Sequence, residues 1–395
     1  MPKDKDTIFS CFGAVIRREL DFMFHRPIYV FSAVFTMLFC SVFFFTLLGS
    51  GSPQRLPIAV VDHDQTVISR RFIHEINSTQ GVEIAMITHS HRDARQALQR
   101  NDVYAFLEIP ANFYDDLLAF RRPKIVIYIN YAYSVGGNQT YKQLLTMANL
   151  ASGAVQQQLL QKRGKNEQLV NTMIQPIVVD SHQISNPWAN YSAYLLSTLL
   201  PGIFGLVILM LTIFSIGDEL KNKTSREWLK AAGHNYHIAL IGKMLPYSIL
   251  YMTIGLGLVA LFFRFNSFPM QGSLVNMYIY MMLFTFATQA MAITWISVFP
   301  VLRDAISAGA LYGMLSFSLS GFTYPAMAML PFVQALTYLF PLRYYYLLYC
   351  AEALNGAPAN QTIPLCLALI AFCVLPVLLQ KRLHKALIYQ NYPLK

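Results

Sequence analysis

Six long apolar stretches constrain the fold of this chain more than any other feature of its sequence. A helix that crosses the hydrocarbon layer of a membrane, about 30 Å thick, needs about 20 mostly apolar residues. The stretches of that length cover residues 28–48, 194–216, 238–263, 274–299, 305–324 and 362–379. We therefore predict an α-helical polytopic membrane protein with six spans.

The composition excludes several other classes of protein. Charged residues make up 13% of the chain and hydrophobic residues 55%, whereas a soluble domain carries about 25% charged residues. An ordinary soluble enzyme and a disordered chain are both excluded. The net charge of +10 stands beside long apolar runs, so it indicates membrane topology rather than a nucleic-acid partner. All five cysteines lie in or next to apolar runs, and no disulfide framework is expected.

Lysine and arginine are distributed unevenly over the short loops. With a cytoplasmic N-terminus, the cytoplasmic side holds fifteen of them, Lys243 and Arg303 included, and the short outer loops hold only Arg264 and Arg343. The other thirteen lie in residues 49–193, a segment too long for the positive-inside rule. The asymmetry predicts that both termini are cytoplasmic, with tails at residues 1–27 and 380–395.

The segment before the first span is expected to form an amphipathic helix. Phe9, Phe12, Ile16, Leu20 and Met23 recur every three or four positions and share one helical face. A helix of this kind lies in the membrane interface. The span that follows is longer than the apolar core of a signal peptide, about 7–15 residues, and we expect it to remain uncleaved.

Residues 49–193 have a soluble composition and are expected to form an inserted α/β extracytoplasmic domain. Strand-like apolar runs cover residues 56–62, 82–87, 103–109, 124–129 and 177–179, and helical patterns cover residues 65–77, 93–99, 111–120 and 137–161. Alternation of strand and helix is typical of an α/β domain. Asp64 is expected to cap the helix that begins at Gln65.

Motifs for chemistry are absent or weak. There is no phosphate-binding loop of the G-x-x-x-x-G-K-[ST] type, so the chain is not expected to bind ATP or another cofactor itself. No convergent set of catalytic residues is visible. His234 and His237 beside Glu227, and Asp62-His63-Asp64, are weak metal candidates, and the favoured interpretation is that no metal is bound. Buried charges are scarce in the spans, which argues against a proton- or sodium-coupled transporter.

The loop at residues 217–237 is polar, and Trp228 and Leu229 give it a small apolar contact point. Its Glu219, Thr224, Glu227 and Leu229 resemble the pattern after the second span in type-2 permeases of ATP-binding-cassette (ABC) exporters. The resemblance implies that this loop supplies the coupling helix that docks on the ATPase. Two departures are visible: Lys223 stands where a glycine is usual, and Glu227 follows Thr224 by three residues instead of two.

A second group of residues before the last apolar stretch is similar to the signature of the same family. It comprises Ser320, Gly321, Pro325, Pro331 and Pro341. Glycine and proline close together break the fifth span, so residues 325–361 are expected to run along the outer surface as a re-entrant or interfacial segment. Residues 60–62 and 103–110, with Phe113, resemble the outer domain of the bacterial subgroup that has one span, a large extracytoplasmic domain and then five spans.

The resemblance implies a permease subunit in the bacterial inner membrane that exports a substrate with energy from a separate ATPase, which would hold ATP and Mg²⁺. A second copy or a close paralogue would complete the path, and the periplasmic domain is expected to contact an adaptor leading to an outer-membrane channel. Two other classes stay open. One is a non-transporting membrane receptor or scaffold whose outer domain binds a partner, and the other is an integral membrane enzyme.

Overall fold

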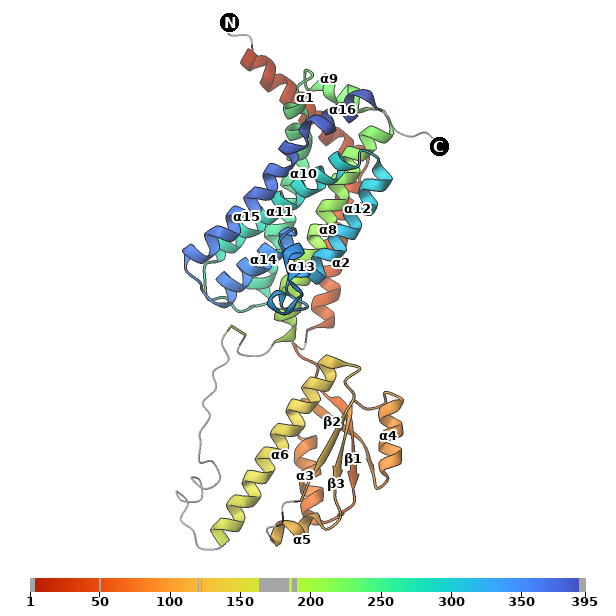
Figure 1. The fold of residues 1–395 in the computed structure, drawn as a ribbon, viewed down its shortest axis with the longest axis vertical. Helices are drawn as coiled ribbons and strands as arrows, with labels where there is room; N and C mark the ends of the chain where they lie inside the picture. Colours follow the sequence, from red (N-terminus) through yellow and green to blue (C-terminus); the bar gives the residue numbers. More distant parts are fainter. Residues whose placement is uncertain are drawn as a thin grey trace. The chain divides into compact units, whose positions relative to one another are not determined.

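The structure is a computed structural model that describes residues 4–49, 51–119, 121, 123–162, 185–186 and 190–390. The chain divides into two compact units, one formed by Met1–Gly49 with Gln183–Lys395 and the other by Ser50–His182. The first unit is helical, and the second contains the β-sheet (Figure 1).

The helical unit begins with two consecutive helices, α1 (Asp4–His25) and α2 (Ile28–Leu47). After the second unit it continues with α8 (Tyr191–Lys221), α9 (Ser225–Ala231), α10 (Tyr236–Ala260), α11 (Leu274–Val298), α12 (Leu302–Leu319), α13 (Pro331–Thr337), α14 (Pro341–Tyr349), α15 (Ala359–Leu378) and α16 (Gln380–Tyr389). Helices α10 and α14 each end in a π-helical turn, Leu261–Phe265 and Cys350–Leu354.

Five described helices are long and apolar enough to cross a membrane: α2, α8, α10 with its π-helical turn, α11 and α15. They coincide with five of the six predicted spans. The stretch predicted as the fifth span, residues 305–324, forms the shorter helix α12, which is not among them. The 18 residues of α12 include Arg303 and Asp304 near its start and several serines and glycines, which lower its hydropathy.

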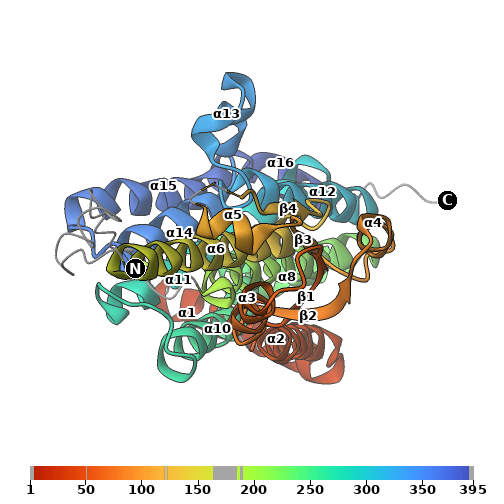
Figure 2. The ribbon, with the colours of Figure 1, turned by 90° about the horizontal axis from the view of Figure 1, so that it is seen from below.

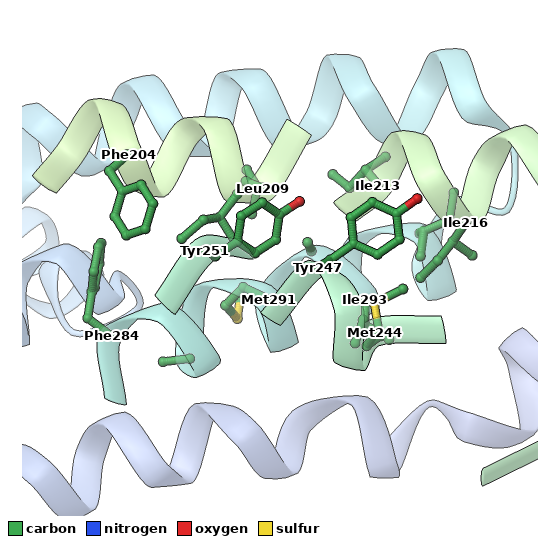
Figure 3. Close-up of a cluster of buried hydrophobic side chains, with 14 of the residues drawn as sticks. Phe204, Leu209, Ile213, Ile216, Met244, Tyr247, Tyr251, Phe284, Met291 and Ile293 are labelled. Carbon is green, nitrogen blue, oxygen red and sulfur yellow. The ribbon is translucent and has the colours of Figure 1, made fainter. Parts of the chain in front are cut away.

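The long helix α8 lies at the centre of the unit and packs against α11 and α12. Phe204, Leu209 and Ile213 of α8 belong to the same buried cluster as Tyr247 and Tyr251 of α10, and the two tyrosine rings lie between these helices (Figure 3). The most apolar windows of α11 and α8 are 67% and 61% buried, whereas only 22% of that of α2 is buried. Since apolar side chains can face lipid in a membrane, α2 is suited to the periphery of the unit.

Glycines set the distance between α8 and α12. A Cβ atom on Gly217 would lie 2.5 Å from Leu302 Cδ1 and 3.3 Å from Leu302 Cα, and a Cβ on Gly309 would lie 2.6 Å from Ile213 Cδ1. Small residues let two helix backbones approach closely. Gly309 lowers the helix propensity of α12, but it also permits the contact that holds α12 in place.

The second unit is a four-stranded sheet in the order β2-β1-β3-β4. Its strands are β1 (Leu56–Asp62), β2 (Val82–Thr88), β3 (Ala105–Ile109) and β4 (Val126–Ile129), and its helices are α3 (Val67–Asn77), α4 (His91–Gln99), α5 (Phe113–Leu118) and α6 (Ser134–Lys162). β1 pairs in parallel with β2 and β3, and β4 is antiparallel to β3. The α/β prediction is confirmed for these elements, and the expected strand at residues 177–179 lies outside the described residues.

The two faces of the sheet are covered by different helices. Ile58 and Val60 of β1 lie in a cluster with residues of α3 and α6, whereas the alternate residues Ala59 and Val61 lie in a cluster with residues of α4. Alternate residues of a strand point to opposite faces, so β1 is apolar from Leu56 to Val61 because both faces are covered.

The cap predicted for the first helix of this unit is wrong. Thr66 caps α3, because its side chain accepts a hydrogen bond from the amide of Ser69. Asp64 instead accepts hydrogen bonds from the hydroxyl of Thr66 and the amide of Tyr114. The turn that precedes α3 is closed by Asp62, whose Oδ1 accepts hydrogen bonds from the amides of Asp64 and Gln65.

Candidate functional site

Helix α9 is a short element between two turns that require left-handed backbone. Lys223, two residues before it, has φ of +58°, and Gly233 and His234 have φ of +63° and +61° after it. This conformation costs little for glycine and more for other residues. A glycine at position 223, as in the pattern that this loop resembles, would adopt this conformation without strain.

Four charged side chains, Arg18, Glu19, Glu219 and Lys243, meet beside α9 and form what we call the buried charge cluster. Lys243 Nζ lies 2.8 Å from Glu19 Oε2 and 3.1 Å from Glu219 Oε1. Arg18 Nη1 lies 2.8 Å from Glu219 Oε1 and 2.8 Å from Glu19 Oε1. The cluster therefore ties together α1, the last turn of α8 and the first half of α10.

The cluster is closed to solvent on most sides. The side chains of Lys243 and Glu19 are 0% exposed and that of Glu219 is 4% exposed. Burial opposes the charge of Arg18, but its hydrogen bond to Glu219 and the neighbouring carboxylates outweigh burial and raise the pKa of Arg18. Two cations and two anions balance, which is the condition under which buried charges are tolerated.

Helix α9 is joined to this cluster by a hydrogen bond and by an aromatic ring. The hydroxyl of Thr224, the residue before α9, donates a short hydrogen bond to Glu219 Oε2. Trp228 is fully buried, and its indole nitrogen donates to the carbonyl of Ala239 on α10 at 3.2 Å. Lys243 Nζ lies 5.1 Å from the centroid of the Trp228 ring, within cation–π range.

The C-terminal helix α16 holds α9 from another direction. The hydroxyl of Ser225 donates to the carbonyl of Leu387, and Arg226 Nε donates to the carbonyl of Ile388, at 2.8 and 3.0 Å. Gln390, just after α16, donates to the carbonyl of Lys223 at 2.8 Å. Helices α1, α9 and α16 thus meet at one end of the helical unit (Figure 1).

The five residues predicted to couple to an ATPase fall into two groups. Glu219, Trp228 and Leu229 are buried, and Thr224 is half-buried against Glu219. Glu227 is exposed. The coupling role stays a prediction, but the buried members can serve it only by positioning α9, because they have no surface to offer a partner. Direct contact is left to exposed side chains of the same helix, namely Arg226, Glu227 and Lys230.

Sequence reasoning missed most of the buried charge cluster. Lys243 is counted with the cytoplasmic lysines and arginines, and Arg18 and Glu19 lie within the segment predicted as an interfacial helix, with no pairing expected for either. A lysine inside the apolar stretch at residues 238–263 was the available signal, because a charge within a span requires a partner. In α1, Val15 and Glu19 are fully buried, whereas Phe9 of the predicted apolar face is 75% exposed.

The second signature group forms the turns around α13 and α14. Ser320 ends α12, where its hydroxyl donates to the carbonyl of Phe317 at 2.9 Å. Gly321 follows with φ of +89°, a conformation suited to glycine. Pro331 and Pro341 occupy the first positions of α13 and α14, where the missing amide hydrogen costs nothing. Pro325 precedes a short 3₁₀ turn at Ala326–Ala328.

A separate polar group lies in the second unit, next to the carboxyl ends of β1 and β3. His63 Nε2 and His91 Nδ1 each lie 3.0 Å from one carboxylate oxygen of Glu108. Partial burial opposes the ionisation of Glu108, but the hydrogen bonds with both histidines outweigh it and lower the pKa of Glu108. Within the described part of the chain, no group of three or more His, Cys, Asp or Glu side chains is arranged to hold a metal ion.

Comparison with known proteins identifies the family. A search of individually curated proteins gave no match. The family model described as "ABC-2 family transporter protein" matches residues 27–379, which include the membrane-capable helices, the second unit and α9. Proteins of this family are transmembrane components that work with a separate ABC ATPase. The chain belongs to the ABC-2 family of transporter proteins, as a multi-pass membrane permease.

Proposed function

We propose that this chain is the permease subunit of an ABC exporter and that α9 is its coupling helix. The observation that carries the proposal is the attachment of α9, which is held by the buried charge cluster on one side and by α16 on the other. A short helix fixed in this way moves with the unit as a rigid body. A force applied to its exposed face would therefore reach the membrane helices.

The buried charge cluster would transmit a force from α9 to the longer helices that it connects. Glu219 ends the central helix α8, Lys243 lies in α10, and Glu19 lies in α1. Breaking a buried ion pair leaves an uncompensated charge, so separating these helices would have a large free-energy cost. ATP and Mg²⁺ would be held by the ATPase, and its closure on ATP would push α9 and shift α1, α8 and α10 together.

The proposed location is a bacterial inner membrane, with both termini and α9 in the cytoplasm and the α/β unit in the periplasm. The excess of lysine and arginine in the loops on that side supports this orientation. The meeting of α1, α9 and α16 at one end also supports it, because two termini on one side require an even number of crossings, and the proposal takes α12 as the sixth beside the five membrane-capable helices.

A complete transporter would contain two permease chains, either two copies or this chain and a close paralogue, with one ATPase at each α9. The large periplasmic unit supports contact with an adaptor protein and an outer-membrane channel, since its size exceeds what a connecting loop needs. Membrane lipid surrounds the assembly. The proposed direction of transport is outward, from the cytoplasm or the inner membrane.

The test is ATP hydrolysis by the co-purified ATPase in lipid nanodiscs. Glu227→Lys reverses a charge on the exposed face of α9 and should abolish stimulation of hydrolysis without lowering the melting temperature. Trp228→Ala should lower both, because it removes a buried ring from the joint between α9 and α10. Lys381→Glu, on the exposed face of α16, is the matched control and should change neither.

The same experiment separates the proposal from its alternative. A non-transporting receptor or scaffold would bind its partner through the outer domain and would not need an ATPase at α9. Full stimulation of hydrolysis by Glu227→Lys, with the ATPase still bound, would place the docking surface elsewhere. Failure to recover any ATPase with the chain would favour the receptor or scaffold.

A further inference from the structure

Arg343 is a nearly buried cation without an anionic partner among the described residues. It is the only charged residue from residue 305 to residue 351, and it is 9% exposed. Its Nε atom is buried with no hydrogen bond, and its guanidinium forms no ion pair with a described residue. A guanidinium carries five N–H donors and stays charged in proteins, so an anion beside it would offset its desolvation.

The nearest carboxylate along the chain is already occupied. Glu352 Oε1 accepts hydrogen bonds from the amide of Ser273 at 2.7 Å and from Asn276 Nδ2 at 2.9 Å, and its Oε2 accepts one from the hydroxyl of Tyr280 at 3.1 Å. Glu352 thus satisfies the start of α11 and does not pair with Arg343. The anion for Arg343 has to come from outside the described chain.

Two nitrogen donors lie beside Gly321. A Cβ atom on this residue would lie 3.5 Å from Arg343 Nη1 and 4.0 Å from the amide nitrogen of Ala326. Because Gly321 has no side chain, residue 321 does not cover these two nitrogen donors. On the other side, the guanidinium carbon of Arg343 lies 5.1 Å from the centroid of the Tyr338 ring, which fixes the direction of the side chain.

The segment that begins at Gly321 is apolar and projects from the helical unit. Residues 321–340, which include α13, form what we call the apolar arm, and α13 stands apart from the neighbouring helices in Figure 2. Met327, Leu330 and Phe332 are 94%, 74% and 75% exposed, and the arm has no charge. Apolar side chains as exposed as these fit the acyl chains of a membrane.

We propose that Arg343 and the turn at Gly321 bind the phosphate group of a membrane phospholipid, whose acyl chains pack along the apolar arm. Arginine presents a planar fork of donors that matches two phosphate oxygens. The unpaired guanidinium accounts for the phosphate, and the arm favours a lipid over free phosphate as its source. This inference does not depend on the function proposed for α9, which lies toward the other end of the unit (Figure 1).

Native mass spectrometry of the full chain in detergent, titrated with short-chain phosphatidylglycerol, tests the phosphate contact. Arg343→Gln should weaken binding by about ten- to a hundredfold, because a hydrogen bond to a charged group is lost. Arg343→Lys should retain part of the affinity. Arg264→Gln removes an exposed arginine and should leave it unchanged. Equal binding by wild type and Arg343→Gln would overturn the proposal.

Two competitors identify the source of the phosphate. Diacylglycerol, which lacks the phosphate, should not displace the bound lipid. Inorganic phosphate should displace it only at far higher concentration. Displacement by inorganic phosphate at the same concentration as the lipid would refute a lipid site and assign Arg343 to a free anion.

A fluorescent probe tests the arm separately, so that a variant that fails to fold does not decide the result. Leu330→Trp places an indole on the exposed arm, and nanodiscs with brominated acyl chains should quench its fluorescence. Lys221→Trp, at the exposed end of α8, is the control and should be quenched much less. Lack of quenching together with crosslinking of residue 330 to a second copy would refute acyl-chain packing and show that the arm belongs to a dimer interface.

Discussion

Replacement of Lys243 by methionine tests the buried charge cluster most directly. Methionine keeps much of the length of the side chain but removes its charge. Glu19 and Glu219 would then share Arg18 as their only described cation, and both carboxylates are almost completely buried. Removal of one partner from a buried ion pair costs about 3–5 kcal/mol.

Protonation of one of the two glutamates sets an independent upper limit on this free-energy cost. The variant can avoid the extra buried charge if one carboxyl group takes up a proton. For a glutamic acid with a reference pKa of about 4.3, protonation at pH 7 costs about 3.7 kcal/mol, at 1.36 kcal/mol per pH unit. The two estimates agree, and the second predicts that the penalty falls to about 1.6 kcal/mol at pH 5.5. The variant should therefore be stabilised, relative to wild type, as the pH is lowered.

Thermal unfolding in nanodiscs, followed by tryptophan fluorescence at pH 7.0 and 5.5, measures the effect. At about 2–4 °C per kcal/mol, Lys243→Met should lower the melting temperature by about 7–15 °C at pH 7.0 and by less than half of that at pH 5.5. Lys381→Met, on exposed α16, is the control and should change little at either pH. Glu19→Gln combined with Lys243→Met should recover much of the loss, because it restores charge balance.

An equal loss of stability at both pH values would refute the electrostatic reasoning. It would show that Lys243 contributes through packing alone. A comparable loss in the Lys381→Met control would show that any change at this end of the unit perturbs unfolding, and the cluster would have no special part in it.

Three further predictions follow from individual residues. Lys223→Gly should raise the stability of the helical unit by up to about 1 kcal/mol, measured by thermal unfolding, because glycine adopts a φ of +58° without strain. Gly217→Val should destabilise the helical unit by about 1–3 kcal/mol, because the added Cβ would meet the Leu302 backbone. Gly257→Val is the control and should cost less, because no atom lies within 4 Å of its added Cβ. Equal costs for the two variants would exclude overpacking as the cause. Because the pKa of Glu108 is lowered in the folded state, its carboxylate contributes to the stability of the second unit above the unfolded-state pKa, near 4.3. That contribution is lost as the pH falls through the pKa of the folded state. Hydrogen exchange in β3, corrected for intrinsic rates, should therefore accelerate below about pH 4 in wild type. An exposed control, Glu83→Gln, should show the same acceleration. Glu108→Gln should show no such acceleration, because it lacks the ionised carboxylate at any pH.

Local patterns in the sequence were enough to predict the positions of most helices and strands. The strand at residues 56–62 and the span at residues 274–299 were placed within one residue of β1 and α11, because hydropathy and periodicity are properties of neighbouring residues. The helix start at Thr66 was misplaced because Asp62, Asp64 and Thr66 are all suitable caps, and only the backbone geometry of the turn selects one.

The sequence by itself determined that this chain is a membrane protein with an inserted α/β unit, since both follow from composition and short spacing, and its resemblance to a known family indicated that the loop at residues 217–237 is of the ABC-2 type. Only the tertiary structure decided which charges meet. Arg18 pairs with Glu219 across 201 positions, and Lys243 pairs with Glu19 across 224. Spacing carries no information over such distances, because contact depends on how the helices pack and not on separation along the chain. The same packing buries Trp228, which the sequence presented as a surface contact, and leaves Arg343 without an anionic partner among the described residues.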